Sequence, residues 1–342
     1  MSDDYLWDRT GQPDPDVQRL EALLGALRSS RPAPAVGEPG PRAASTRWGW
    51  GALAAAATVA VAVGAASVWI GTRGRGETWT LTWLDGASWA EARAVRQSRL
   101  GTGQWIETRT SRARLQVGGI GEVQLEPATT IGLVAVGHQV HRLSLVRGVM
   151  HALIWAPPGR FVVETPSAVA VDLGCRYTLE VEDDGSGVLR VEAGWVGFEH
   201  GGVRSLVPAG AVGDTRPGKG PGTPHYEDAS AAFSAALDVI DFGGDADARR
   251  QALDAVLGEA RPRDALSLWH LLSRLDGEAR GRVHDRLAEL VPPPAALTRR
   301  GILAGDRAML DAWWDELDLG PAESWRPWTA PWSSSPAATT GR

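Results

Sequence analysis

One cysteine and three neighbouring histidines are the side chains of this 342-residue sequence with the clearest capacity for chemistry. A cysteine of low pKa can act as a nucleophile, and converging histidines can hold a metal ion. Cys175 lies in the segment FVVETPSAVAVDLGCRYTLEV (161–181), in which apolar residues occupy the odd positions from Val169 to Val181. That alternation predicts one half-buried strand with Cys175 on its apolar face. We therefore expect the thiol to pack as a small hydrophobe.

The histidines do not form a ligand set in this pattern. His138 and His141 are three residues apart, and His151 follows in the same strand-like region. In a strand, residues three apart point to opposite faces, so these rings would not converge on one ion. We expect no metal site here.

Other motifs of catalysis are missing from the sequence. It has no phosphate-binding loop ending in G-K-[ST], no H-E-x-x-H and no G-x-S-x-G. Asp183 and Asp184 lie in a D-D-G-S-G turn, where aspartate is favoured for hydrogen bonds to nearby backbone. We therefore expect no catalytic residue, metal or cofactor, and we predict that the protein is not an enzyme.

Composition excludes further classes. The chain carries 35 Lys and Arg against 41 Asp and Glu, a net charge of -6, so its overall balance does not indicate direct nucleic-acid binding. A single cysteine excludes an intramolecular disulfide framework and a cysteine zinc cluster. The 41 glycines and 22 prolines are typical of a turn-rich, strand-rich protein.

Residues 48–72, WGWGALAAAATVAVAVGAASVWIGT, contain no charged side chain. As a helix, about 20 of them span the roughly 30 Å hydrocarbon layer of a membrane. Trp48, Trp50 and Trp69 lie where interfacial aromatic residues are expected. A buried helix of a soluble core and a cleaved signal peptide are the alternatives, but a signal peptide begins with a short basic stretch rather than 47 residues. We predict an uncleaved, single transmembrane helix.

Charge on either side of the span indicates its orientation. Arginines 28, 31, 42 and 47 precede it, whereas Arg73 and Arg75 follow it. The bias favours a cytoplasmic N-terminus, with the larger C-terminal part outside.

The segment before the span contains a short amphipathic region. Residues 1–28 carry an apolar stripe at helical spacing, formed by Val17, Leu20, Leu24 and Leu27, and an aromatic residue, Trp7, nearer the N-terminus. We expect these five residues to bind a partner. A helix of this length is marginal alone in water, so the stripe needs a partner, the membrane or a second copy. Residues 29–47 are a Pro/Gly-rich linker by composition.

Beyond the span, the hydrophobic period changes twice. From 78 to 213, short segments of period two alternate with turn clusters, which predicts six to ten strands in a layered or solenoid-like β domain. Residues 214–225 read as a linker, and residues 226–320 show apolar residues three and four apart, as in a helical array. We expect the tail, 321–342, to be disordered.

An ordered set of motifs in the β region resembles the FecR domain of transmembrane sigma-factor regulators. The set comprises a strand ending in Arg-Gly, a Thr-Pro step with a later glycine, a strand ending in E-x-G-x-V, and a closing leucine with a glycine four residues later. In this chain these are Arg147 and Gly148; Thr165, Pro166 and Gly174; Glu192, Gly194 and Val196; and Leu206 and Gly210. The resemblance covers roughly residues 115–214.

The resemblance implies a bacterial inner-membrane protein with a cytoplasmic segment that acts on an extracytoplasmic-function sigma factor, one span, and a periplasmic sensor domain that meets an extracytoplasmic protein or ligand. This chain departs from the family's pattern in three places. Its N-terminal segment is short, Cys175 replaces the usual threonine after Gly174, and helices stand where iron-uptake members meet an outer-membrane transporter. We therefore expect signal transduction and transcription regulation, an anti-sigma role, without a predicted transporter contact. The alternative is a membrane-tethered scaffold that binds an envelope component and regulates no sigma factor.

Overall fold

The computed structural model describes residues 78–86, 88–137, 140–317 and 319. None of the helices in these ranges is long and apolar enough to cross a bilayer. The predicted span at 48–72, the segments 1–28 and 29–47, and the tail 321–342 lie outside the described residues.

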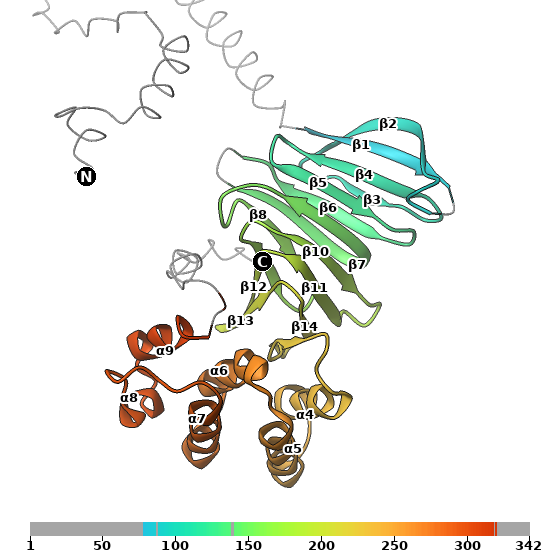
Figure 1. The fold of residues 1–342 in the computed structure, drawn as a ribbon. Helices are drawn as coiled ribbons and strands as arrows, with labels where there is room; N and C mark the ends of the chain where they lie inside the picture. The colour runs from blue at the N-terminus through green and yellow to red at the C-terminus, as the bar shows by residue number, and fades with distance from the viewer. Residues whose placement is uncertain (1–77, 87, 138–139, 318, 320–342) are drawn as a thin grey trace, which may run out of the picture. The chain divides into compact units, whose positions relative to one another are not determined.

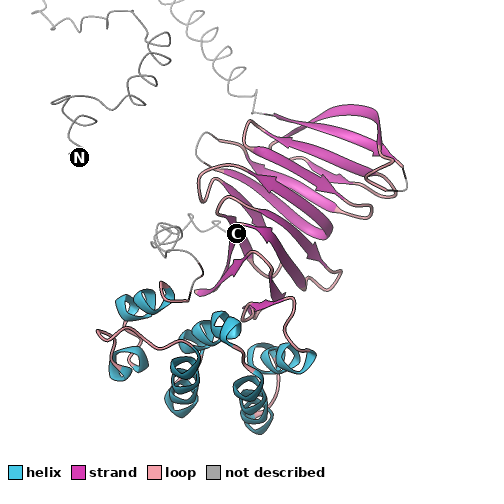
Figure 2. Cartoon of the chain, in the orientation of Figure 1, coloured by secondary structure: helices cyan, strands magenta, loops and turns pink. Residues whose placement is uncertain are grey.

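Sixteen strands form one continuous, almost entirely antiparallel sheet, followed by helices (Figures 1 and 2). The first eight strands are β1 (Thr78–Asp85), β2 (Arg93–Gly101), β3 (Trp105–Glu107), β4 (Arg112–Val117), β5 (Gly121–Leu125), β6 (Thr130–Ala135), β7 (His141–Ile154) and β8 (Phe161–Glu164). The others are β9 (Val169–Asp172), β10 (Arg176–Val181), β11 (Gly187–Ala193), β12 (Trp195–His200), β13 (Val203–Pro208), β14 (Ala211–Arg216), β15 (Gly220–Pro221) and β16 (His225–Tyr226). The mainly β fold with C-terminal helices that the sequence predicts is confirmed.

The sheet has two layers because β7 belongs to both. In layer A the neighbours run β2, β1, β4, β5, β7, β10, β11, β14 and β15, with β16 also on β14. In layer B they run β3, β6, β7, β8, β9, β12 and β13. The alternating apolar positions predicted for β4, among them Leu115 and Val117, are 0% exposed in the resulting core.

β7 changes layer at Gly148. The strand pairs with β6 and β8 up to Arg147 and with β5 and β10 from Gly148 onward. Gly148 has a φ of 93°, and a Cβ there would lie 2.5 Å from Thr129 Cα. The left-handed backbone and this close approach both require glycine.

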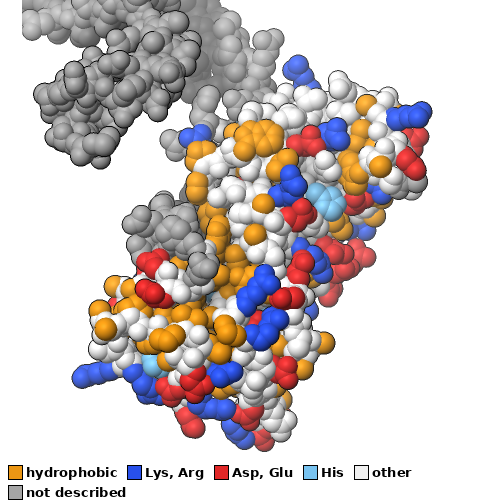
Figure 3. All heavy atoms as spheres, in the orientation of Figure 1, with side chains coloured by type: hydrophobic (Ala, Val, Ile, Leu, Met, Phe, Trp, Pro, Cys, Tyr) orange, Lys and Arg blue, Asp and Glu red, His pale blue; other side chains and the backbone are white. Residues whose placement is uncertain are grey.

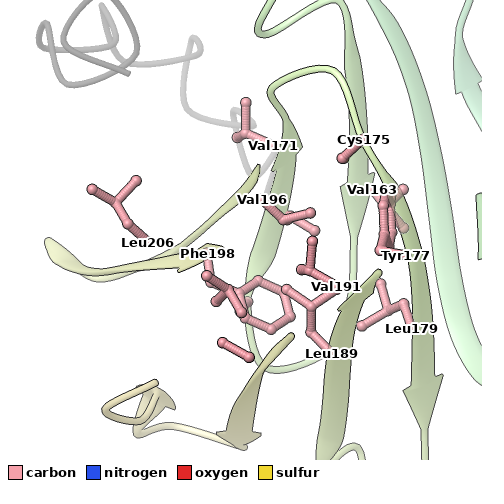
Figure 4. Close-up of a cluster of buried hydrophobic side chains, with 14 of the residues drawn as sticks. Val163, Val171, Cys175, Tyr177, Leu179, Leu189, Val191, Val196, Phe198 and Leu206 are labelled. Carbon is pink, nitrogen blue, oxygen red and sulfur yellow. The ribbon is translucent and has the colours of Figure 1, made fainter. Parts of the chain in front are cut away.

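The strand predicted from Val169 to Val181 is two strands in different layers. β9 ends at Asp172 in layer B, and β10 begins at Arg176 in layer A. The intervening Gly174 has a φ of 90°, which ends the alternation. Cys175 remains on the inner face as predicted, but Val171 faces outward, and Figure 4 shows it pointing away from the buried cluster. The prediction of one continuous apolar face is therefore wrong before Gly174.

The helices are α4 (Ala231–Phe242), α5 (Ala246–Glu259), α6 (Ala265–Arg274), α7 (Gly277–Leu290), α8 (Arg299–Leu303) and α9 (Arg307–Trp314), with a 3-10 turn η1 (Pro262–Asp264) before α6. Each of the side chains of Ser230, Asp245, Thr298 and Asp306 accepts a backbone N–H in the first turn of the helix that follows it.

The stretch expected as a linker between the two parts is largely ordered against the sheet. Within 214–225, the first three residues complete β14, Gly220–Pro221 forms β15, and His225 opens β16, which pairs with β14. Ser205 Oγ donates to the Gly222 carbonyl at 2.7 Å. Glycine and proline in this stretch form tight turns between paired strands rather than a linker between the sheet and the helices.

Candidate functional site

The glycines of the family motif lie where the chain passes between the layers. Gly174 separates β9 from β10, Gly194 separates β11 from β12, and Gly210 separates β13 from β14. All three have positive φ, at 90°, 75° and 77°. The turns are bonded to one another, since the Ala209 N–H donates to the Gly194 carbonyl at 3.0 Å and the Gly210 N–H to Val191 at 2.7 Å. These motif positions therefore build the frame of the domain.

Two further motif elements also have structural roles. Arg147 donates to Glu107 at 2.8 Å and to Asp183 at 3.5 Å, which ties the bend of β7 to β3 and to the β10–β11 turn. Thr165 closes the β8–β9 turn, because its hydroxyl donates to the Ala168 carbonyl at 2.8 Å and accepts the Ala168 N–H at 3.0 Å. Pro166, in the same turn, is exposed.

The motif residue Glu192 lines a hollow on the sheet surface. It lies exposed at the end of β11, in a groove of about 400 Å³ on the outer face of layer A. The other lining residues are Trp89, Glu122, Gln124, His151, Ala152, Leu153 and Arg176. Leu153, near the end of β7, is 40% exposed, and Trp155, which directly follows β7, is 59% exposed. We call the hollow that Glu192 and the other lining residues form the layer A groove.

A polar network positions one wall of the layer A groove. Glu126 accepts hydrogen bonds from the indole N–H of Trp89 and from Arg112 Nε at 2.9 Å. His151 Nε2 lies 3.3 Å from the same carboxylate, and its Nδ1 lies 2.8 Å from Thr178 Oγ1. Burial raises the pKa of Glu126, but the hydrogen bonds and the Arg112 charge outweigh it and hold the pKa below its usual value. Glu126 is therefore an anion that fixes the Trp89 ring.

The composition of this groove suits the binding of a partner. Exposed aromatic and apolar side chains beside charged groups are typical of interaction surfaces. His141 lies in the layer B half of β7, where its ring centroid is 5.6 Å from that of Trp79. His151 lies in the layer A half of the same strand, so the two rings do not converge. Within the described ranges, no group of three or more His, Cys, Asp and Glu side chains is placed to hold a metal ion.

Cys175 packs inside the domain, as the sequence predicts. It is 4% exposed, and its thiol donates to Asp172 Oδ2 at 2.6 Å, while the Gly174 N–H donates to Oδ1 at 2.7 Å. Burial, and next the Asp172 charge, raise the pKa of the thiol. Burial also raises the pKa of the Asp172 carboxyl to about 7. The thiol is thus not an activated nucleophile.

The helices join the sheet through two buried side chains of α6. His270 Nε2 accepts the Leu206 N–H of β13 at 3.0 Å, and its Nδ1 donates to the Leu266 carbonyl at 2.8 Å. Burial lowers the pKa of His270 to about 3, so the ring is neutral. Arg274 donates to the backbone carbonyl of Pro221 and to Ser205 Oγ, and it pairs with Asp241 of α4 at 3.3 Å.

A hollow of about 560 Å³ lies along this junction, between β13 and helices α4, α6 and α9. In the face shown in Figure 3, hydrophobic side chains continue from the strands to the helices. Three of the four Lys and Arg side chains that line it pair with carboxylates: Arg204 with Glu199, Arg274 with Asp241, and Arg307 with Asp311. This hollow is therefore charge-balanced along much of its wall.

The sequence-predicted partner stripe, Trp7 to Leu27, lies outside the described residues. The layer A groove was not predicted, because Trp89, Glu126 and His151 come together only through strand pairing. The alternation of Glu122, Gln124 and Glu126 identifies a polar face in the sequence but not what covers it.

Comparison with known proteins supports the family resemblance. Residues 104–197 match the family described as FecR protein, which confirms the predicted resemblance over less than half of the chain. Two crystal structures of a "putative anti-sigma factor" from Parabacteroides distasonis, at 1.65 and 2.50 Å resolution, each show a TM-score of 0.33 and 15% sequence identity. Each comparison covers 39% of this chain, which spans 63% of that protein's length. No curated protein matches the chain.

Proposed function

We propose that this protein regulates a cytoplasmic sigma factor of the extracytoplasmic-function type. In this proposal it crosses the bacterial inner membrane once, through 48–72, with residues 1–28 in the cytoplasm and the described β and helical parts in the periplasm. The stripe at Leu20, Leu24 and Leu27 docks into a groove of the sigma factor as an amphipathic helix.

The observation that carries the proposal is the FecR match at 104–197. Its motif glycines occupy the left-handed turns that connect the two layers, so the likeness reaches the residues that shape the domain. The uncharged span and the apolar stripe of the N-terminal segment support the same arrangement. In this arrangement the layer A groove is the surface that receives the external signal.

Co-purification tests the sigma-factor contact. The full chain is expressed with the sigma factor encoded beside it, and the amount recovered with the chain is measured. Leu20→Asp and Leu24→Asp should each reduce recovery at least tenfold, because each places a charge in an apolar interface. Ala22→Asp is the matched control, since it lies on the opposite face of the helix. Equal recovery with all three variants would contradict the proposal.

Reporter fusions test the orientation. A fusion before Trp48 should be active only as a cytoplasmic reporter, and a fusion after Gly76 only as a periplasmic one. The reverse pattern, or cytoplasmic activity at both points, would remove the transmembrane part of the proposal.

The second candidate is a tethered scaffold that binds an envelope component. The exposed Leu153 and Trp155 beside the layer A groove favour it, because they suit direct binding without any cytoplasmic contact. Absence of a small sigma-factor gene next to this one, with the chain still retained on envelope material, would favour the scaffold.

A further inference from the structure

The outer face of layer B carries an apolar strip that its own strands leave facing away from the core. Val162 of β8 pairs with Val171 of β9, and Val171 with Gly197 of β12, so these positions share one face. Val169 lies on the same face, two residues before Val171. Val162 is 0% exposed and Val171 is 2% exposed, although both face outward. We call Val162, Val169 and Val171 the valine strip.

The helices cover the neighbouring end of this face. Trp195 of β12 lies outward, and its ring is 5.6 Å from that of Trp314, the last residue of α9. Trp314 also contacts Trp269 of α6 at 4.7 Å. Leu317 is 9% exposed, and Leu319 packs against the same core. The last described residues therefore follow a helix whose final residue, Trp314, packs on the same face as the valine strip.

The other end of the face is hollowed and has a charged rim. A hollow of about 270 Å³ is lined by the valine strip together with Arg142, Glu199, His200 and Gly201. Arg142 pairs with Glu164 at 2.6 Å on one side, and Arg204 pairs with Glu199 at 3.2 Å on the other. An apolar floor between two ion pairs suits an uncharged, aromatic occupant.

We propose that the occupant is the C-terminal segment of this same chain, 321–342, with Trp325 and Trp328 seated on the valine strip. The segment reads PAESWRPWTAPWSSSPAATTGR, and Pro327 and Pro331 favour an extended, polyproline-type backbone. In that conformation residues three apart share a face and lie about 9 Å apart. This separation is about two strand spacings, the distance from β7, which carries Arg142, across Val162 of β8 to the two valines of β9.

Distance and chemistry both allow the contact. The six residues from Leu319 to Trp325 can span at most about 20 Å. The distance to be bridged is short, because Trp195, which contacts the end of α9, and Val171 of the strip lie on adjacent strands. An indole over the strip also comes within reach of the Arg142 guanidinium, where a cation–π contact is favourable. Because the segment is tethered to α9, its effective concentration at the strip far exceeds that of a free partner. This inference is independent of the sigma-factor proposal.

Amide hydrogen exchange of the full chain tests the docking. We compare it with a chain that ends at Gly320 and with the full-length double variant Trp325→Ala, Trp328→Ala. Exchange in residues 161–172 should be at least tenfold faster in both, because the strip loses its cover. Trp332→Ala is the matched control, since it lies off the shared face and should change exchange less than twofold. Unchanged exchange in β1 and β4 shows that the fold is kept.

Two outcomes would overturn the proposal. One is an exchange rate in 161–172 that stays within twofold of the full chain when Trp325 and Trp328 are replaced. Because this double variant keeps the full length, it tests the proposal even if the shortened chain misfolds. The other is a chain ending at Gly320 that forms a dimer while the full-length double variant exchanges normally, which would assign the strip to a second copy.

A labelled peptide of residues 321–342, added to the chain ending at Gly320, provides a direct reading by fluorescence anisotropy. Val169→Glu should weaken its binding at least tenfold, whereas Val95→Glu, which is 63% exposed on β2, should leave it unchanged. Equal weakening by both substitutions would count against the strip as the binding site.

Discussion

The backbone of Gly194 packs directly on that of Gly174, so that a Cβ on Gly194 would lie 2.2 Å from the Gly174 carbonyl oxygen. The two residues belong to turns that carry the chain in opposite directions between the layers, from β9 to β10 and from β11 to β12. The turn at Gly174 therefore depends on Gly194 having no side chain, whereas a Cβ on Gly174 would meet only the Ala156 carbonyl oxygen, at 3.6 Å.

Gly194→Ala should lower the free energy of unfolding by more than about 2 kcal/mol, because it adds this clash to the strain of a positive φ. Gly201→Ala is the control, since Gly201 has a φ of 56° but a Cβ added there would meet no atom within 4 Å. We expect about 1 kcal/mol there. Denaturant unfolding of both variants measures the difference, and equal losses would show that the contact with Gly174 is unimportant.

Asp172 should make stability depend on pH. Burial raises its pKa to about 7 in the folded chain, above the unfolded value, so folding takes up a proton between about pH 4 and pH 7. The free energy of unfolding should therefore fall as pH rises through this range, by at most about 4 kcal/mol, and should level off above pH 7. Asp172→Asn should flatten this part of the profile. A wild-type profile that rises from pH 4 to pH 7, matched by the variant, would contradict the assignment.

Cys175 should resist alkylation in the folded chain. Its thiol is 4% exposed, and burial raises its pKa, so little reactive thiolate forms. Mass spectrometry after treatment with iodoacetamide should show the single cysteine unmodified in buffer and fully modified in denaturant. Rapid modification under native conditions would place the thiol at the surface instead.

Arg274 should hold the helices to the sheet. Its side chain is 12% exposed and faces Asp241, which is 6% exposed, so Arg274→Met leaves a buried carboxylate without its cation. We expect a loss of about 3–5 kcal/mol in denaturant unfolding. Arg300→Met, at an exposed position of α8, should cost little.

The double variant Arg274→Met, Asp241→Asn separates charge from packing. It should recover part of the loss, because no unpaired buried charge remains. A double variant less stable than Arg274→Met alone would mean that the Asp241 carboxylate stabilises the fold through the Thr223 N–H and hydroxyl, which it accepts, rather than through Arg274.

Local pattern was sufficient to predict the strands and helices that keep a single period. The helical spacing of Leu266, Trp269 and Leu272 corresponds to α6, and the alternation at Leu115 and Val117 corresponds to β4. In β4 one face is buried along the whole strand, so the pattern in the sequence equals the pattern of burial. In α6 the apolar stripe is buried, but so is every other residue from Ala265 to Leu272, so the pattern predicts the helix and not the full extent of its burial.

Prediction failed where the chain changes layer. Val171 and Cys175 belong to one alternating pattern in the sequence, but in the structure Gly174 places them on opposite faces. The positive φ of a glycine cannot be predicted from the hydropathy pattern. The layer A groove was missed for a related reason. Glu126 and His151 are 25 residues apart, and only the register of β5 against β7 brings them together.

The neutral ring of His270 has a consequence for self-association. By accepting the Leu206 N–H, it fills a bonding position on the outer strand β13, which would otherwise be a template for another polypeptide. The helices thus prevent another strand from pairing with the edge of β13 at Leu206. A proteolytic product that ended after β16 would lack His270 and would leave the Leu206 N–H on the edge of β13 open to pairing with another strand.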